Sequence, residues 1–342
     1  MKFVFITDIH CKESGKLIND LPESIYYARE NLFKAADVAV ENKCDYLVIG
    51  GDMVEDKKYL HQLTITNIQS VIDEISRRIN VIILIGNHDY VVVNGKQVTF
   101  LEGLASERVK VITGYEIIDD VAFVSHHFDR DVLRENVFEC CKSCDVIVSH
   151  FGLNEGVMSN NMRVQGEFSI AEFNIFTDDK LFILGHYHKP QEVAYKNNKA
   201  IYVGSCQPTR SDEFFDDKRF ILFDSSNKQI IEYPTLYRRC HKLVIEKLDD
   251  EANVVEECKK LLSESDCRVY IESHIVPSRT VIDYYMNSRD DVYLSVKLQK
   301  NSAEVITENN EISSIDVMSC IEEWLKQNDV YNEKVMQKIR EV

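Results

Sequence analysis

The stretch Ile183-Leu184-Gly185-His186-Tyr187-His188-Lys189-Pro190 determines how the rest of this sequence is interpreted, because an apolar run ends in two closely spaced histidines. Four earlier fragments have the same construction. Each follows an apolar run directly and carries metal-binding side chains; they are Asp8-Ile9-His10, Gly51-Asp52, Gly86-Asn87-His88-Asp89 and Ser149-His150. The apolar runs are typical of buried parallel strands. The sequence therefore predicts five strands that bring these side chains to one edge of a sheet, where open α/β folds bind ligands.

The residue types at this predicted edge are those that bind a pair of divalent metal ions. Two such ions about 3.5–4 Å apart clamp a phosphoryl group and generate hydroxide near neutral pH. A mixture of carboxylate, imidazole and amide ligands favours Mn2+, Fe or Zn2+ over Ca2+. The assignment we favour gives each metal three ligands and one shared bridge, namely Asp8, His10 and His188 for the first metal, Asn87, His150 and His186 for the second, and Asp52 between them.

The order of these motifs is more specific than any one of them. A lone D-x-H or G-x-H occurs by chance, and the alternative interpretation is that these polar residues only cap strand ends. The ordered set D-x-H, G-D, G-N-H-D, S-H and G-H-x-H resembles the calcineurin-like metallophosphoesterases, over about residues 1–232. This resemblance implies that His88 lies near the scissile phosphate, where it stabilises charge or protonates the leaving oxygen. It also implies that Asp89 orients an imidazole.

Hydrophobic periodicity predicts the fold class. Strands and helices alternate through the first third of the chain, which implies a parallel sheet with right-handed crossovers. Helices are predicted at residues 24–40, 59–78 and 129–144. Short strands at 109–112, 116–118 and 121–125 predict a hairpin-rich second sheet, and later strands are expected at 145–149, 181–184, 192–195, 200–203, 219–224 and 230–233. We predict a four-layer α/β/β/α metallophosphoesterase sandwich with a smaller C-terminal α+β domain and terminal helices.

Bulk properties limit the protein's class and location. The 342 residues, 44% apolar and 28% charged, suit a globular protein with two domains. We expect no membrane association, because no apolar run reaches the length of a transmembrane helix. We also expect no signal peptide, because residues 1–2 lead directly into the first strand. The ten cysteines predict reduced thiols and a cytoplasmic location, in a bacterial host if a phage encodes the protein. Cys140-Cys141-x-x-Cys144 is expected to be buried in a helix, since no second pair follows at zinc-site spacing.

The net charge of −17 argues against a broadly basic nucleic-acid-binding protein. Any DNA binding must therefore depend on local patches, on the metals or on a partner protein. Five histidines outside the predicted ligand set are expected to be solvated or to lie at the rim of the site or beyond the core: His61, His126, His127, His241 and His274.

Two features narrow the phosphoesterase class. Protein phosphatases carry an arginine after the bridging aspartate, whereas Asp52 is followed by Met53-Val54-Glu55. Residues 200–205 and 218–224 resemble SbcD-type nucleases, which work with a coiled-coil ABC-type ATPase in DNA repair. This resemblance, with the phage-encoded branch favoured by the compact length, implies a Mn2+-dependent DNA endo- and exonuclease. The alternatives are a small-molecule or nucleotide phosphodiesterase and a catalytically inactive scaffold; the complete ligand set disfavours the scaffold.

The sequence departs from the SbcD-type pattern at two positions. Cellular members have a histidine where Glu55 stands and a proline where Cys206 stands. Glu55 is a further catalytic candidate, since a carboxylate accepts a proton or holds a water molecule but cannot supply positive charge to phosphate. We expect this residue to change the balance between exonuclease and endonuclease activity.

The remaining chain is predicted to divide after residue 234. The expected parts are the nuclease core at 1–234, a cap-like α+β domain at 235–300, an acidic linker at 301–311 and a helical partner-binding segment at 312–342. An apolar stripe on the terminal helices is expected to dock on an SbcC-like ATPase, with four anchor residues, Val317, Ile321, Trp324 and Leu325. The alternative is that these helices fold back on their own domain. DNA and a second copy of the chain complete the expected partners.

Overall fold

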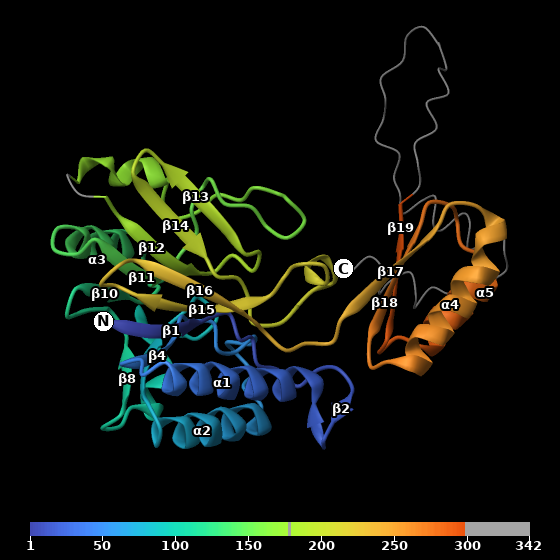
Figure 1. The fold of residues 1–342 in the computed structure, drawn as a ribbon, viewed down its shortest axis with the longest axis horizontal. Helices are drawn as coiled ribbons and strands as arrows, with labels where there is room; N and C mark the ends of the chain where they lie inside the picture. Colours follow the sequence, from blue (N-terminus) through green and yellow to red (C-terminus); the bar gives the residue numbers. More distant parts are fainter. Residues whose placement is uncertain (177–178, 298–342) are drawn as a thin grey trace, which may run out of the picture. The chain divides into compact units, whose positions relative to one another are not determined.

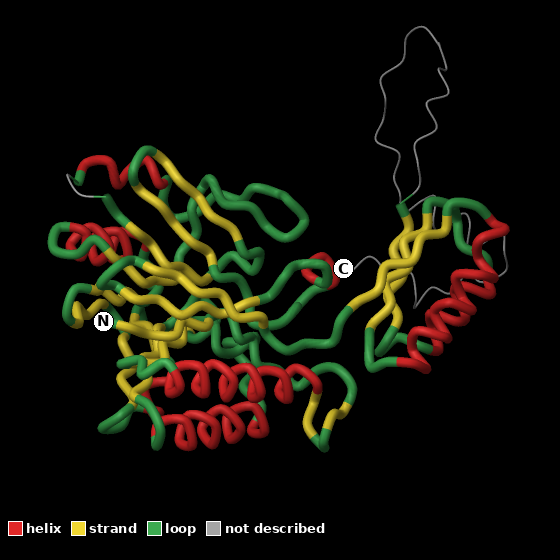
Figure 2. Tube along the Cα trace, viewed as in Figure 1, coloured by secondary structure: helices red, strands yellow, loops and turns green. Residues whose placement is uncertain are grey.

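The structure is a computed structural model that describes residues 1–176 and 179–297, which belong to one compact unit, Met1–Leu298. Its first part contains two six-stranded sheets (Figure 2). The first sheet has the order β16-β15-β1-β4-β5-β8, with bounds Gln229–Pro234, Arg219–Asp224, Lys2–Ile6, Tyr46–Ile49, Asn80–Leu84 and Val109–Ile112. The second has the order β13-β14-β12-β11-β10-β9, with bounds Gln191–Tyr195, Asn198–Tyr202, Leu181–Gly185, Val146–His150, Val121–Val124 and Tyr115–Ile118.

Three apolar clusters separate the layers of this part of the molecule. Helices α1 (Glu23–Glu41) and α2 (Gln62–Ser76) pack on the outer face of the first sheet (Figure 1). Helix α3 (Arg130–Cys141) and the 3-10 turn η2 (Ile170–Ile175) cover the second sheet. Alternate side chains of both sheets meet between them, among them Phe3, Phe5, Phe123, Val148 and Ile183. Each fully buried side chain of this size contributes about 1.5–3 kcal/mol. The predicted four-layer α/β/β/α architecture is confirmed.

The predicted single sheet edge is wrong, because the ligand-bearing strands divide between two sheets. Strands β1, β4 and β5 are parallel neighbours in the first sheet, whereas β11 and β12 are parallel neighbours in the second. Runs that are apolar on both faces predict buried parallel strands, but they do not identify which strands pair. The site therefore lies where the carboxyl ends of strands from two facing sheets converge.

Strand β8 is also placed differently from the prediction. It pairs in parallel with β5 in the first sheet, so only β9 and β10 form the predicted hairpin of the second sheet. The chain reaches β8 through elements that the sequence did not predict, the hairpin β6–β7 (Val91–Val93 and Lys96–Val98) and the turn η1 (Phe100–Leu104). Short strands separated by few residues suggest hairpins, but the strand that β8 pairs with lies earlier in the chain, outside this local stretch.

A smaller three-stranded parallel sheet follows the two large ones along the chain. Its order is β17-β18-β19, with bounds Cys240–Ile245, Arg268–Ser273 and Val292–Val296. Helices α4 (Glu251–Glu264) and α5 (Arg279–Asn287) connect these strands and pack on the sheet. The sequence predicts strands at 240–246, 268–273 and 292–298 and a helix at 253–263. Strands β17, β18 and β19 and helix α4 match these predictions, whereas α5 was not predicted. The predicted linker and partner-binding segment lie outside the described residues. Among the helices that are described, none is long and apolar enough to cross a membrane.

The described residues also form several short elements. They are the hairpin β2–β3 (Leu17–Ile18 and Leu21–Pro22) and two 3-10 turns, η3 (Ser211–Glu213) and η4 (Leu248–Asp250). Cys140, Cys141 and Cys144 are buried around the end of α3, as the sequence analysis expected.

Candidate metal centre

The loops that follow the site strands have unusual backbone conformations. Asp8, His10, Asp52 and His186 have positive φ angles of 51°, 47°, 51° and 90°. Such angles are uncommon for residues with side chains and cluster at functional sites, where the surrounding structure enforces them. Gly86 is required for a different reason, because a Cβ atom there would lie 2.2 Å from Asp52 Oδ1. These loops are held in one arrangement at some conformational cost.

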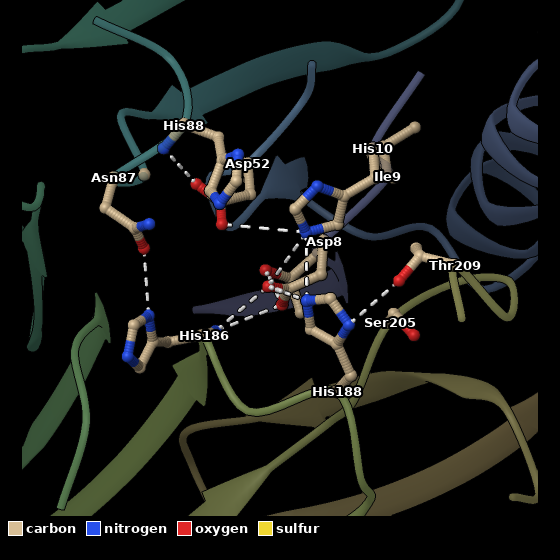
Figure 3. A network of polar contacts seen from close by, with 12 residues as sticks. Asp8, Ile9, His10, Asp52, Asn87, His88, His186, His188, Ser205 and Thr209 are labelled. Carbon is tan, nitrogen blue, oxygen red and sulfur yellow. Dashed lines mark hydrogen bonds and ion pairs between the residues drawn. The ribbon is translucent and has the colours of Figure 1, made fainter. Parts of the chain in front are cut away.

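One half of the site contains Asp8, His10 and His188 (Figure 3). The Nε2 atoms of the two histidines lie 2.9 Å apart. Asp8 Oδ1 lies 3.9 Å from His10 Nε2 and 3.7 Å from His188 Nε2. These three ligand atoms point toward one small volume, as the ligands of a single cation do.

The other half contains Asn87, His150 and His186. Asn87 Oδ1 lies 2.9 Å from His186 Nδ1 and 3.2 Å from His150 Nε2. Asp52 lies between the halves, since its Oδ2 is 3.3 Å from His150 Nε2 and 3.6 Å from His10 Nε2. The structure thus brings together all seven residues that the sequence predicted as ligands. Their carboxylate, imidazole and amide donors fit two transition-metal ions with Asp52 as the shared ligand.

Three of the histidines are oriented through the nitrogen that faces away from the centre. His150 Nδ1 lies 2.8 Å from the carbonyl oxygen of Gly50, and His188 Nδ1 lies 2.8 Å from Glu213 Oε1. His10 Nδ1 lies 2.9 Å from Glu55 Oε2. A proton on each of these nitrogens leaves the nitrogen at the centre free to bind a metal, which is the usual arrangement around metal-binding histidines.

Glu213 is a functional residue that the sequence analysis missed. Its carboxylate accepts hydrogen bonds from Thr209 Oγ1 at 2.7 Å, Ser205 Oγ at 3.1 Å and the fully buried Lys218 Nζ at 3.0 Å. Burial opposes ionisation of Glu213, but the hydrogen bond with His188 and the charge of Lys218 hold its pKa well below the usual range. In the sequence, the only indication of this role was the nearby Lys218, which lies in the stretch that resembles SbcD-type nucleases.

Glu213→Gln is expected to weaken metal binding in the half that contains His188, by about 10–100-fold, because loss of an orienting carboxylate has that effect in other metal sites. It should also lower the melting temperature, since Lys218 loses a charged partner in a buried position. Metal titration followed by thermal unfolding tests both effects. Glu192→Gln is the control, because Glu192 is an exposed glutamate paired with Lys199 at 2.7 Å. Equal metal affinity in both variants would contradict the role of Glu213.

His88 lies at the mouth of the centre and is partly exposed. Its backbone N–H donates to Asp52 Oδ1 at 2.7 Å, and its ring Nδ1 lies 2.7 Å from the carbonyl oxygen of Glu55. A cavity of about 190 Å³ opens over the centre and includes His88 among its walls. This placement suits the predicted contact with a phosphate. His10, Glu55 and His88 also lie close enough to hold a metal ion themselves, so both roles are open to His88.

Asp89 does not orient an imidazole, and that prediction is wrong. Its Oδ1 accepts hydrogen bonds from the backbone N–H groups of Met53 at 2.8 Å and Val54 at 3.3 Å, and its Oδ2 accepts one from Gly86 at 2.8 Å. Burial and the nearby charge of Asp52 raise the pKa of Asp89 to about 7. The buried Asp89 carboxylate therefore connects the loop that carries Asp52 with the loop that carries Asn87 through hydrogen bonds.

The structure also shows the surroundings of two further residues, Glu55 and His126, which the sequence could not predict. The Glu55 carboxylate contacts His10, which lowers its pKa to about 2 and makes it a support for a predicted ligand. His126 is buried, with 7% of its surface exposed, and it stacks on Tyr90. Its ring centroid lies 6.4 Å from that of His150. The expectation that His126 is solvated is therefore wrong; it lies just after β10, beside Tyr90 and near His150.

Comparison with known protein families agrees with this geometry. The family model described as calcineurin-like phosphoesterase matches residues 1–190, more than half of the chain. The chain belongs to the calcineurin-like phosphoesterase family. It is therefore a member of a superfamily of metal-dependent phosphoesterases, and the described residues include three groups of side chains that could hold a metal ion.

Several solved phosphoesterase structures are similar to this calcineurin-like phosphoesterase. An archaeal phosphodiesterase is 16% identical, with a TM-score of 0.36, over 68% of this chain and 99% of that one. A dimetal phosphatase from Danio rerio is 11% identical, with a TM-score of 0.40, over 68% and 95% of the two chains. Phosphopantetheinyl hydrolase from Mycobacterium tuberculosis is 15% identical, with a TM-score of 0.33, over 60% and 89%. No curated protein matches the sequence.

Proposed function

We propose that this calcineurin-like phosphoesterase is the Mn2+-dependent DNA endo- and exonuclease subunit of an SbcC–SbcD-like recombination and repair complex. The observation that carries the proposal is the position of the stretch that resembles SbcD-type nucleases. Ser205 and Lys218, which belong to that stretch, hold Glu213 against His188 at the candidate metal centre. The absence of arginine between Asp52 and Glu55 supports a phosphodiester substrate over a protein phosphomonoester.

The residues of the site account for hydrolysis of a phosphodiester. Two bound metal ions would supply a hydroxide and neutralise charge on the phosphoryl oxygens. Asp52 has oxygen atoms near both halves of the centre, so it fixes the two halves relative to each other. His88, at the mouth, would donate a proton or a hydrogen bond to the leaving oxygen. Gly50 and Glu213 keep His150 and His188 in the required tautomers.

The deciding experiment compares substrates with the purified full chain and Mn2+. Labelled linear duplex, single-stranded and hairpin DNA are tested beside bis(4-nitrophenyl) phosphate, and the Asp52→Asn variant controls for contaminating nucleases. Cleavage of DNA that is lost in this variant supports the proposal. Turnover of the small ester alone would favour the alternative, a small-molecule or nucleotide phosphodiesterase.

Glu55 should bias the activity toward endonuclease cleavage. A carboxylate that supports His10 cannot supply the positive charge that a histidine at this position provides to phosphate. Without a partner protein, we expect cleavage of single strands or hairpins to be easier to detect than processive exonuclease activity. Glu55→His should raise the exonuclease share, and Glu55→Ala should weaken both activities by loosening His10. Strong partner-free exonuclease activity that is unchanged in Glu55→Ala would refute this role.

We further propose that residues 312–342 bind an SbcC-like coiled-coil ATPase. The apolar residues Val317, Ile321, Trp324 and Leu325 lie outside the described residues, so the proposal rests on their helical spacing alone. A chain that ends at Asn310 should fold, keep its metals and cleave simple DNA, but fail to co-purify with the ATPase. Trp324→Ala should weaken the complex on its own, since aromatic anchors carry much of the binding energy. Insolubility or metal loss on truncation would assign the helices to the protein's own core.

The compartment and the assembly state are also proposals. The cysteines among the described residues are all free, which fits the reducing cytoplasm. A second copy of the chain is proposed as a further partner, and light scattering of the purified protein tests it.

A further inference from the structure

A second cavity, of about 260 Å³, adjoins the candidate metal centre. It shares two wall residues, Thr209 and Arg210, with the cavity that opens over the centre. We call it the basic cavity. Its other walls come from the loop after β1, from the start of α1, from the segment before β15 and from the three-stranded sheet, and the polar residues that matter are Lys12, Ser14, Ser24, Ser211 and Arg268.

The charge of the basic cavity is opposite to that of the chain. Its described wall residues include three cations, Lys12, Arg210 and Arg268, and no carboxylate. The chain as a whole has 57 acidic and 40 basic residues, so such a group is not expected from composition. The neighbouring cavity over the metal centre, by contrast, has four carboxylates in its walls. Serine and threonine hydroxyls add neutral donors to the three cations. This combination of donors suits phosphate oxygens.

The three cations have donor capacity to spare. Arg210 is exposed, and its guanidinium makes no hydrogen bond or ion pair with any residue in the described ranges. Arg268 pairs with the buried Glu23 and lies over the Phe214 ring at 5.1 Å, yet its buried Nε has no partner among the described residues. Lys12 Nζ has only a distant contact, 4.0 Å from Glu55 Oε1. An anion could therefore bind without displacing an existing short ion pair of Arg210 or Lys12.

Two segments of chain contribute residues both to the basic cavity and to the surroundings of one half of the metal centre. Lys12 follows His10 by two residues, and both contact the Glu55 carboxylate. Thr209 lies next to Arg210, and its Oγ1 is 3.3 Å from His188 Nδ1. A group bound in the basic cavity would thus lie beside the half of the centre that contains His10 and His188.

We propose that the basic cavity binds a second phosphate group of the substrate, the one that neighbours the scissile phosphate along a nucleotide chain. Arg210 supplies the main contact, and Lys12 and Arg268 supply the others. The inference deepens the proposed function, because it explains how a chain with a net charge of −17 binds a polyanion locally. It also predicts that nucleotides with two phosphate groups bind better than those with one.

Isothermal titration of the full Mn2+-loaded chain tests this directly. Thymidine 3′,5′-bisphosphate is compared with thymidine 5′-monophosphate and 3′-monophosphate. The bisphosphate should bind about tenfold more tightly than the better monophosphate, the effect of one charge-assisted hydrogen-bonded contact. This advantage should disappear in Arg210→Ala and return in part in Arg210→Lys. Arg279→Ala is the matched control, because the Arg279 side chain is 84% exposed and is not in either cavity.

Two results would overturn the subsite. One is equal affinity of the wild-type protein for the bisphosphate and the monophosphates. The other is an advantage of the bisphosphate that persists in Arg210→Ala. Failure of the proposed function is distinguishable from both, because it is measured by DNA cleavage. If the protein prefers the bisphosphate through Arg210 but cleaves no DNA, the subsite is supported and the nuclease assignment is refuted. If it cleaves DNA but shows no preference for the bisphosphate, the nuclease assignment is supported and the subsite is refuted.

Discussion

Asp52→Asn is expected to lower phosphodiester hydrolysis by about a thousandfold, since metal-assisted charge stabilisation is worth several kcal/mol and each 1.36 kcal/mol changes the rate tenfold. The reason is the position of Asp52 between the two halves of the centre, with Oδ2 close to both His10 and His150. Asparagine has nearly the same shape but removes the negative charge that both metals would share. Both metal equivalents should therefore bind more weakly, which metal analysis after dialysis measures.

A matched variant separates this effect from a general loss of carboxylate charge. Asp56 is exposed and lies four residues further along the same segment, so Asp56→Asn should retain both metals and full activity. Asp52→Asn should also fold, although the hydrogen bond from the His88 N–H to Asp52 Oδ1 constrains the loop and must be kept by the amide oxygen. If Asp52→Asn lost only one metal equivalent, Asp52 would belong to one half of the centre and would not be the bridge.

His88→Ala is expected to lower the rate of hydrolysis by about 100–10,000-fold, the usual contribution of a positioned acid or base, while both metal equivalents remain. The structure gives a reason to separate these readouts. His88 lies at the mouth of the centre, but its ring also lies near His10, with 5.0 Å between ring centroids, and near Glu55. A phosphate contact predicts loss of rate alone, whereas a ligand role predicts loss of metal.

The control for this variant is His61→Ala, because the His61 side chain is 62% exposed and lies outside the site. Rate and metal content should be unchanged there. The leaving group provides a further readout: an ester with a good leaving group, such as 4-nitrophenol, needs less protonation and should be less affected by His88→Ala than DNA is. Loss of one metal equivalent in His88→Ala would show that His88 binds a metal ion with His10 and Glu55.

The sequence by itself determined the strands and the ligand set, because both depend on local patterns. An apolar run that ends in a metal-binding residue defines a buried strand and the loop at its carboxyl end, and this holds for β1, β4, β5, β11 and β12. Parallel strands place the loops after β1, β4 and β5 together in one sheet and those after β11 and β12 together in the other. The family model matches residues 1–190, a range that contains all of these motifs.

Only the tertiary structure decided how these strands divide between two sheets and what surrounds the ligands. Strand pairing is set by contacts between residues far apart in the chain, which is why β8 joins the first sheet instead of a hairpin in the second. The same holds for Asp89, a neighbour of His88 in sequence whose carboxylate accepts hydrogen bonds from the backbone N–H groups of Met53 and Val54 in another loop. Glu213 and the basic cavity combine residues from distant segments, and no local pattern specifies such a combination. Burial and hydrogen-bonding partners are properties of the packed chain, so side chains of one type acquire their separate roles only when the fold brings those segments together.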